Sequence, residues 1–342
     1  MLLWPFAIIY GAITRIRNIL YEYNIFRSGR VQIKTLVVGN LRVGGTGKTP
    51  FVEWLTHFFL NQGTEFCILS RGYGRSTNGF LEANEQSTSN DIGDEPMQYY
   101  TKFGPMGVKV FVGEDRVEAI EHIHKLYSTV SLVILDDAYQ HRSLFADRYV
   151  LLTEFERPFY NDHMLPMGRL RESRYGACRA DAVVVTKSPS NALLQKQVVY
   201  KEIGKYINPI TPIFFNRIQY TTLKPLFRHF LPETINDVIL ISGIANPANF
   251  ISHCKSEYNV LEVFVFADHH AFKEEEVQEI IYKASFHGEN VMIVTTEKDA
   301  MRLFGFSRLF LKCPIAFLPI ANSFMDIEEE NNFKNSLLSW FA

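Results

Sequence analysis

The sequence predicts an α/β fold built on a large, mostly parallel sheet, and two observations carry this prediction. The β-branched run at 31–38 leads into a glycine-rich turn and then into an amphipathic helical pattern that begins at Pro50. Apolar runs of strand length then alternate with helical patterns, as at 66–70, 108–112 and 131–137. Such alternation is typical of parallel strands joined by right-handed crossovers.

The chain of 342 residues is long enough for two lobes, and its pattern indicates where they divide. Residues 213–225 alternate partly between apolar and polar side chains and predict a β-ribbon linker, after which a new strand-helix alternation begins. We therefore expect a first lobe at 31–212 and a smaller second α/β lobe at 226–342. Residues 1–30 precede both lobes as a separate helical segment.

Composition indicates a packed globular protein and gives no sign of a nucleic-acid partner. Hydrophobic residues make up 47% of the chain and charged residues 21%, which suits a sizeable core. The formal net charge is −2, so nothing global favours DNA or RNA, and no feature indicates an obligate protein partner. The four cysteines lack C-x-x-C spacing, which disfavours a zinc site or a disulfide framework and suits a reducing cytosol.

The first fourteen residues are apolar and uncharged, and a basic segment follows them. Its arginines are Arg15, Arg17, Arg27 and Arg30. A signal peptide has the reverse order, and the uncharged run is shorter than the roughly 20 residues of a spanning helix. With Trp4 near its start, the segment predicts an interfacial anchor on the cytoplasmic leaflet, peripheral or monotopic. A buried N-terminal helix is the alternative.

A phosphate-binding loop is predicted between the first strand and the helix at Pro50. Glycines let backbone N–H groups turn inward, the lysine reaches the outer phosphates, and the threonine hydroxyl ligates Mg²⁺. The predicted nucleotide-binding residues are Arg42, Val43, Gly44, Gly45, Thr46, Gly47, Lys48 and Thr49. The pattern G-x-x-x-x-G-K-[ST] requires glycine where Arg42 stands, so a chance glycine turn is the competing interpretation.

Two aspartates close the clearest predicted strand, at the edge where a parallel sheet binds its ligands. Asp136 or Asp137 would hold Mg²⁺ opposite Thr49, directly or through water, as in a Walker B arrangement. Thr49, Asp136 and Asp137 are thus the predicted metal-binding residues. Arg169 and Arg171, on a later loop, could clamp phosphate, and a solvated face is the alternative.

Two further places carry groups suited to proton transfer. Asp94 and Glu95 open a predicted helix, where simple capping of the helix N-terminus explains them equally well. His269 and His270 follow the strand predicted at 261–266, with no third metal ligand nearby, which favours a general acid or base over a metal site. A hydrogen-bonded histidine at a strand end is the alternative.

Eight motifs, spread in order over nearly the whole chain, resemble the tetraacyldisaccharide 4'-kinase family of the lipid A pathway. They are Gly39-Asn-Leu-Arg-Val-Gly-Gly-Thr-Gly-Lys-Thr-Pro50, Ser70-Arg-Gly-Tyr-Gly74, Gly93-Asp-Glu-Pro96, Asp136-Asp-Ala-Tyr-Gln-His-Arg142, Leu170-Arg-Glu172, Gly243-Ile-Ala-Asn-Pro247, Asp268-His-His270 and Thr296-Glu-Lys-Asp-Ala300. That family tolerates a residue other than glycine at position 42. The chain departs from it at Ala138-Tyr139, where Gly-Phe is usual, and at Ala267, where proline is usual. Neither change removes a reactive group.

The resemblance implies an ATP- and Mg²⁺-dependent kinase with a P-loop lobe and a second α/β lobe joined by a β-ribbon. Its acceptor is the 4'-hydroxyl of a tetraacylated glucosamine disaccharide 1-phosphate. It also implies that the apolar N-terminal helix sits on the cytoplasmic face of the bacterial inner membrane, where this lipid lies. Asp94 is then the expected catalytic base, paired with His269, although the resemblance does not decide which histidine of the pair 269–270 acts.

Two other functions fit the same residues. A P-loop NTPase that acts as a switch or assembly factor at the membrane would hydrolyse nucleotide to drive a partner. A membrane-bound structural module would carry a degenerate nucleotide loop and bind no nucleotide. Phosphate transfer to a lipid separates the kinase from the switch.

Overall fold

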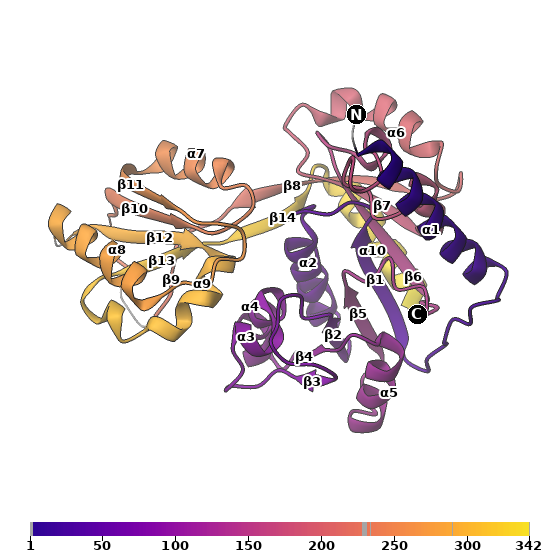
Figure 1. Cartoon of the computed structure of the whole chain (residues 1–342), viewed down its shortest axis with the longest axis horizontal. Coiled ribbons are helices and arrows are strands. Elements are labelled where there is room, and N and C mark those ends of the chain that lie inside the picture. The colour runs from indigo at the N-terminus through magenta and orange to yellow at the C-terminus, as the bar shows by residue number, and fades with distance from the viewer. Residues whose placement is uncertain (1–2, 228–230, 233, 289, 342) are drawn as a thin grey trace.

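The computed structural model describes residues 3–227, 231–232, 234–288 and 290–341, which build two sheets flanked by helices (Figure 1). The larger sheet has nine strands in the order β14-β8-β7-β6-β1-β5-β2-β4-β3. They are β1 (Lys34–Asn40), β2 (Phe66–Ser70), β3 (Leu81–Glu82), β4 (Lys109–Val112), β5 (Leu132–Asp136), β6 (Arg148–Glu154), β7 (Ala182–Thr186), β8 (Ile213–Tyr220) and β14 (Ile320–Phe324). The pairs β14–β8 and β3–β4 are antiparallel and the other pairs parallel, which confirms the predicted sheet type.

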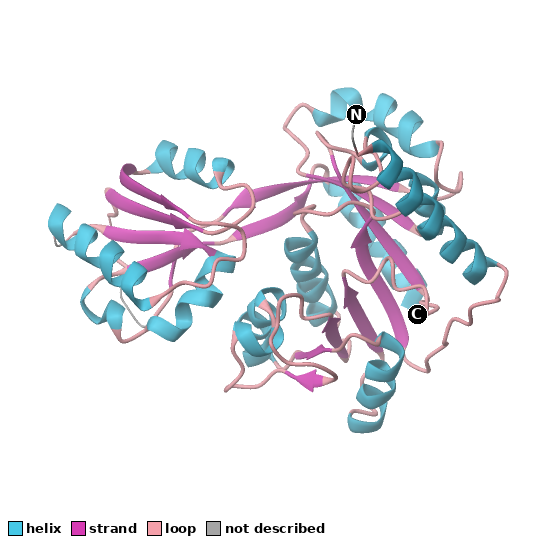
Figure 2. Cartoon of the chain, in the orientation of Figure 1, coloured by secondary structure: helices cyan, strands magenta, loops and turns pink. Residues whose placement is uncertain are grey.

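The smaller sheet has five strands in the order β11-β10-β12-β13-β9. They are β9 (Lys224–Pro225), β10 (Asp237–Ser242), β11 (Asn259–Val265), β12 (Met292–Thr296) and β13 (Ile315–Leu318). Its helices are α7 (Ala248–Glu257), α8 (Glu274–His287) and α9 (Glu297–Leu303). The predicted second α/β lobe is therefore present, and Figure 2 shows it set apart from the first lobe.

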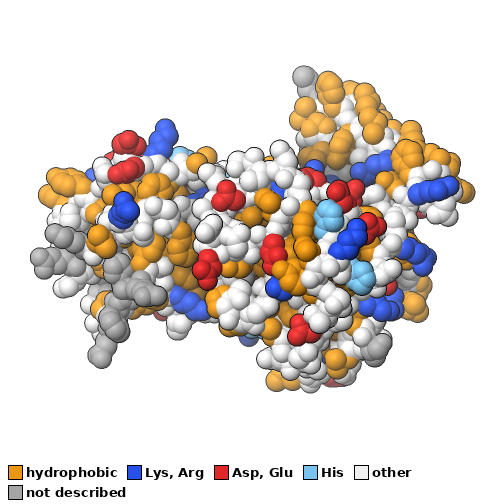
Figure 3. Space-filling model, turned by 90° about the horizontal axis from the view of Figure 1, so that it is seen from below, with side chains coloured by type: hydrophobic (Ala, Val, Ile, Leu, Met, Phe, Trp, Pro, Cys, Tyr) orange, Lys and Arg blue, Asp and Glu red, His pale blue; other side chains and the backbone are white. Residues whose placement is uncertain are grey.

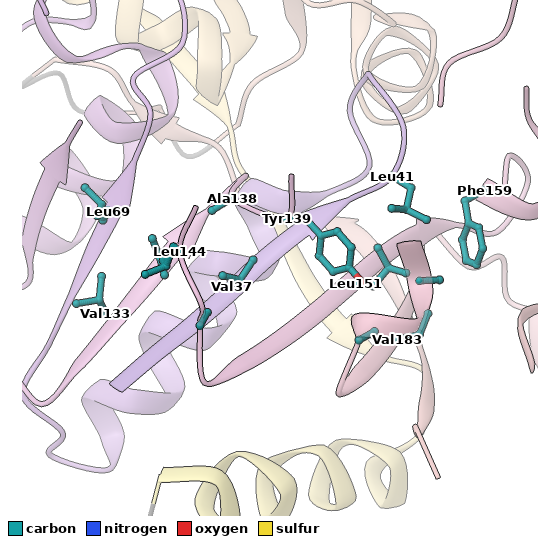
Figure 4. Packing of buried hydrophobic residues seen from close by; sticks show 14 of the residues in the cluster. Val37, Leu41, Leu69, Val133, Ala138, Tyr139, Leu144, Leu151, Phe159 and Val183 are labelled. Carbon is teal, nitrogen blue, oxygen red and sulfur yellow. The ribbon is translucent and has the colours of Figure 1, made fainter. Parts of the chain in front are cut away.

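Alternating side chains of the first sheet pack on its two faces, as a period of two requires. Val37 belongs to the buried cluster on one face, shown in Figure 4, whereas its neighbours Leu36 and Val38 belong to the cluster on the other. The helices of this lobe are α1 (Trp4–Glu22), α2 (Lys48–Asn61), α3 (Ser89–Ile92), α4 (Asp94–Phe103), α5 (Arg116–Leu126), α6 (Lys196–Gly204) and α10 (Ile327–Phe341). Core residues of α5 and α6 join the first cluster, and those of α2, α4 and α10 join the second.

The register of the central strands brings the two predicted phosphate-site elements together. β1 pairs in parallel with β5, so that Val38 lies opposite Asp136. Both strands therefore end at the same sheet edge, and the glycine loop leaves β1 where the paired aspartates leave β5. Helix α2 begins at Lys48, two residues earlier than predicted, after Gly47 takes a left-handed conformation with φ +82°.

The C-terminal end of the chain corrects the predicted extent of the second lobe. We expected 226–342 to form that lobe, but β14 pairs with β8 and lies in the first sheet. Helix α10 also packs there, since Phe333 is fully buried with its ring 5.8 Å from that of Phe51 on α2. The second lobe thus ends after β13, and β8 and β14 together form the ribbon that crosses between the lobes (Figure 1).

Helix α1 lies on the surface of the first lobe and leaves most of its apolar side chains exposed. Only Ala7 and Thr14 of this helix are buried among its described residues. Its exposed large hydrophobic residues are Trp4, Phe6, Ile8, Ile9, Ile13, Ile16 and Ile19. Figure 3 shows hydrophobic side chains gathered at the upper right, where this part of the molecule projects. Within the described part of the chain, no helix has the length and apolar character needed to cross a membrane.

Candidate active site

Hydrogen bonds from Asn40 and Thr186 to Thr46 fix the glycine loop at the edge of the first sheet. Asn40 Nδ2 donates to Thr46 Oγ1 at 2.5 Å, and Thr186 Oγ1 on β7 donates to the Thr46 carbonyl at 2.8 Å. Gly44 has φ +111°, a conformation that glycine adopts freely. The loop then enters α2, whose first residue, Lys48, lies at the positive end of the helix dipole. This arrangement suits the phosphates of a nucleotide.

Lys48 and the aspartates at the end of β5 lie close together, as predicted. Lys48 Nζ is 3.6 Å from Asp137 Oδ1, and Arg171 Nη1 contacts both carboxylate oxygens of Asp137 at 2.9 and 3.0 Å. Burial alone would raise the pKa of Asp137, but these two cations lower it. Arg171 therefore contacts the predicted phosphate site indirectly, by pairing with Asp137 beside Lys48.

Asp136 is the carboxylate that best fits a bound Mg²⁺. Its side chain is buried, and Oδ1 has no hydrogen-bond partner among the residues that the structure describes. Burial and the neighbouring Asp137 raise its pKa to about 7, and Lys48 opposes this shift. An unpartnered buried oxygen is costly, and a cation would satisfy it. No three His, Cys, Asp or Glu residues cluster as a metal site within the described chain, so the nucleotide would have to complete the coordination.

The side chain of Arg42 does not face the phosphate site. Its Nε donates to Asp162 Oδ2 at 2.5 Å, and its Nη1 lies 3.3 Å from Glu154 Oε2 and also bonds the carbonyl of Arg157. The residue is only 5% exposed. Of the predicted nucleotide-binding residues, Arg42 can thus offer only its backbone, and its guanidinium anchors the start of the loop to the segment that follows β6.

Asp94 meets the second lobe at the start of α4. Its Oδ2 accepts hydrogen bonds from His269 Nδ1 at 2.9 Å and from Arg302 Nε and Nη2 at 3.0 and 2.6 Å. Burial alone would raise the pKa of Asp94, but the bonds from His269 and Arg302 outweigh it and lower the pKa to about 2. The hydrogen bond to Asp94 in turn raises the pKa of His269. The predicted Asp94–His269 pair is therefore formed across the two lobes.

The backbone conformation at Gly93 fixes the position of Asp94 at the start of α4. The φ of Gly93 is +94°, and a Cβ there would lie 3.1 Å from both the Gly72 Cα and the Tyr73 carbonyl oxygen. The loop after β2 thus packs directly against the turn before α4. It brings the exposed Tyr73 ring within 5.9 Å of the His269 ring.

The whole chain, residues 1–342, matches the family model for tetraacyldisaccharide-1-P 4'-kinase. This chain belongs to that family. It is 41% identical to the tetraacyldisaccharide 4'-kinase of Cytophaga hutchinsonii over 89% of this chain and 85% of that one, and 38% identical to that of Flavobacterium psychrophilum over 99% and 96%. A crystal structure of LpxK from Aquifex aeolicus, an "apo" form in complex with ATP, matches with a TM-score of 0.77 and 28% identity over the full length of both chains.

The fold of this kinase separates the roles of its two adjacent histidines. His269 has φ +58° and turns toward Asp94, whereas His270 Nε2 bonds Glu276 Oε2 at 2.8 Å. The His270 ring also stacks on Phe266 with centroids 4.7 Å apart. His269 is thus the histidine beside the candidate base, and His270 holds the turn to α8.

Arg302 and Asp299 extend the hydrogen-bonded group around Asp94 and were not predicted as site residues. Arg302 is largely buried and also bonds Asp299 Oδ1 at 2.9 Å and the Gly243 carbonyl at 3.1 Å. Asp299, fully buried, accepts from Thr296 Oγ1 at 2.6 Å. Their spacing of three residues on α9 was the available signal, because it places both on one helix face.

Ion pairs between α4 and α9 hold the two lobes of the kinase at this place. Lys298 pairs with Glu95, the residue after Asp94. Lys102, at the other end of α4, lies 3.2 Å from Glu297 Oε1 and 2.5 Å from Glu53 Oε2 on α2. These contacts keep Asp94 facing the second lobe.

Replacing Arg302 with glutamine should raise the pKa of Asp94, because a cation is lost while the burial remains. Asp94 must be ionised to act as a base, so the acid limb of the kcat profile should move upward by about 1–3 pH units. A pH–rate series checks this, with Arg308→Gln as the control for an exposed arginine near α9. An unshifted acid limb would contradict the assigned role of Arg302.

Proposed function

We propose that this kinase transfers the γ-phosphate of ATP to the 4'-hydroxyl of a tetraacylated disaccharide 1-phosphate at the junction of its two lobes. The observation that carries the proposal is the bond between Asp94 on the first lobe and His269 on the second. The helices that begin at the two centres are in contact, because Gln98 Nε2 on α4 donates to Glu53 Oε1 on α2 at 2.8 Å. Acceptor and nucleotide can therefore meet there.

The first lobe supplies the phosphate side of the reaction. The loop amides of residues 43–47 and Lys48 would bind the outer phosphates, while Asp137 and Arg171 keep the lysine in place. Thr49 and Asp136 fit Mg²⁺, which when bound neutralises charge between the β- and γ-phosphates. Positioning and charge neutralisation are what a loose phosphoryl-transfer transition state requires.

Asp94 would bind the acceptor hydroxyl and take its proton. Its three described hydrogen bonds all end on Oδ2, so Oδ1 is available for the acceptor hydroxyl. A pKa near 2 keeps the carboxylate ionised at neutral pH, and the hydroxyl proton needs to move only late in a loose transition state. His269 donates from Nδ1 to Asp94, which fixes the carboxylate, while its Nε2 lies 3.9 Å from Asp268 Oδ1.

Helix α1 would place this site at the membrane surface that holds the lipid acceptor. Its apolar face is exposed along most of its length, with Ile9 at 57% and Ile16 at 58%, and the exposed Arg15 lies between them in the sequence. An exposed apolar stripe beside basic residues is typical of an interfacial helix. We assign it to the cytoplasmic face of the bacterial inner membrane, as a peripheral or monotopic contact.

Replacing Ile9 and Ile16 with aspartate should weaken binding to anionic phospholipid vesicles by about 100-fold, since two exposed aliphatic side chains that would enter the lipid are replaced by charges. Vesicle cosedimentation measures the change. The matched control is the pair Tyr282→Asp and Phe286→Asp on α8, which are also exposed. Equal vesicle binding by all three proteins would contradict the anchor.

The experiment that tests the proposed reaction follows the label of γ-labelled ATP in detergent micelles with the tetraacylated disaccharide 1-phosphate. A kinase moves the label into the lipid. A membrane NTPase switch releases it as inorganic phosphate and leaves the lipid unlabelled, which would overturn the proposal.

A further inference from the structure

The backbone of Arg171 lies between helix α1 and the start of the glycine loop and has a hydrogen bond to each. On the loop side, the Arg171 N–H donates to the Leu41 carbonyl at 2.8 Å. On the helix side, the Tyr10 hydroxyl of α1 donates to the Arg171 carbonyl at 3.0 Å. The two polar groups of this one residue are therefore divided between α1 and the nucleotide loop.

The side chain of Arg171 continues to the phosphate site. Its Nη1 contacts both carboxylate oxygens of Asp137 at 2.9 and 3.0 Å, and Lys48 Nζ lies 3.6 Å from the same carboxylate. Arg171 and Asp137 are thus the only residues between Tyr10 on α1 and the phosphate-binding lysine along this path. The position of α1 therefore bears on the charges that face the outer phosphates.

A second path from α1 begins at Asn18. Its Nδ2 donates to Glu172 Oε2 at 2.8 Å, and the Glu172 side chain is fully buried. Arg179 donates to both oxygens of Glu172 at 3.0 and 2.8 Å, and Gln140 Nε2 donates to Oε1 at 3.0 Å. Burial alone would raise the pKa of this carboxyl, but the pairing with Arg179 and the two amide hydrogen bonds lower it. Removing the Asn18 amide would leave a buried charge with one donor fewer, which is costly.

Gln140 joins the second path to the glycine loop and to Arg171. Its Nε2 also donates to the Asn40 carbonyl at 2.8 Å, and Asn40 Nδ2 donates to Thr46 Oγ1 within the loop at 2.5 Å. Its Oε1 accepts from Arg171 Nη1 at 3.4 Å. The two paths from α1 therefore meet at the side chains that surround the phosphate site.

Helix α1 lies along the outside of the first lobe, and the face that it turns inward is mainly polar (Figure 1). Only Ala7 and Thr14 are buried among its described residues. Tyr10, Thr14 and Asn18 are spaced by four residues and so share one helix face. Because little apolar surface packs under this face, hydrogen bonds contribute much of what fixes α1 relative to the phosphate site.

We propose that Tyr10 and Asn18 are positioning residues for phosphate transfer, acting through Arg171 and Gln140 on Asp137 and the glycine loop. Helix α1 then has a role in the reaction in addition to its contact with the membrane. The inference rests on the proposed function, because the rate of phosphate transfer is one of its two readouts. The affinity for ATP is the other, and it needs no lipid acceptor.

The test compares wild type with the double variant Tyr10→Phe and Asn18→Leu, which removes both hydrogen bonds and leaves the exposed apolar side chains of α1 unchanged. We expect kcat to fall by about tenfold, roughly threefold for each lost hydrogen bond, and the Kd for ATP to rise about threefold. The KM for the lipid acceptor and the binding to anionic phospholipid vesicles should stay within about twofold of wild type. The matched control is Tyr23→Phe with Asn331→Leu, two exposed residues on the same lobe, which should behave as wild type.

A second comparison separates positioning from a general loosening of the fold. In an Arg171→Gln background, the same two α1 substitutions should lower kcat further by no more than about twofold, because residues that act through one another are non-additive. A repeated tenfold loss in that background would show that α1 acts independently of Arg171 and would overturn the inference.

The remaining outcomes distinguish this inference from the anchor and from the reaction itself. A fall in kcat that is matched by an equal loss of vesicle binding makes α1 an anchor only and overturns the inference. Unchanged kcat in the double variant also overturns it. A wild type that labels no lipid overturns the kinase proposal instead, and the ATP titration then decides this inference, since an unchanged Kd in the double variant would contradict it.

Discussion

Replacing Asp94 with asparagine should lower kcat for phosphate transfer by about 10²- to 10⁴-fold, the usual loss when a general base is removed. Asparagine keeps the size of the side chain and one oxygen for Arg302, but it cannot take the proton of the 4'-hydroxyl. The KM for ATP should stay within about twofold, because Lys48 and the glycine loop are unchanged. Steady-state kinetics with the lipid acceptor measures both quantities.

The matched control is Asp91→Asn, three residues upstream on α3. That carboxylate accepts from Thr88 as a helix cap and touches neither His269 nor Arg302. It should leave kcat unchanged. If Asp94→Asn retains near-normal turnover, Asp94 is not the base and the proton goes elsewhere.

Replacing Lys48 with alanine should lower kcat by about 10²- to 10³-fold or more, as expected for removing one preorganised positive group from a charged transition state. The loss has a second cause, because Asp137 then loses one of its two cationic partners among the described residues and its negative charge is less compensated beside the nucleotide. Transfer assays and nucleotide-binding titrations together measure the effect, and weaker ATP binding should accompany the lower kcat.

Lys34→Ala is the control for this change, since Lys34 is an exposed lysine at the opposite end of the same strand, β1. It should behave as wild type in both assays. Near-normal transfer by Lys48→Ala would show that the glycine loop binds something other than the reacting phosphates.

The sequence predicted the first sheet well because its strands are buried and short. The run 66–70 became β2 and the run at 182–186 became β7, since continuous apolar residues between turns admit few other structures. The return of β14 and α10 to the first lobe was not predictable in the same way. Their partners, β8 and α2, lie far away in the chain, and no local pattern states which sheet a late strand joins.

The same distinction holds for the candidate site. Residues within a local motif were predicted, and residues whose partners are distant in the sequence were not. Lys48, Thr49 and the paired aspartates were found because their positions follow from one loop and one strand end. Arg302 was not, because its role depends on reaching Asp94 from 208 positions away in the chain. Arg42 belongs to the nucleotide motif by position, yet its side chain turns to Asp162, a contact that only the folded segment after β6 creates.

The most direct test of the two-lobe site is a double-mutant cycle on Asp94 and His269, measured as the single-turnover rate of phosphate transfer with ATP and acceptor saturating. If both residues act as one unit across the lobes, the double variant Asp94→Asn with His269→Gln should be no slower than Asp94→Asn alone, because groups that work together are strongly non-additive. If the two losses instead multiply in the double variant, Asp94 and His269 act independently and the shared site proposed here is contradicted.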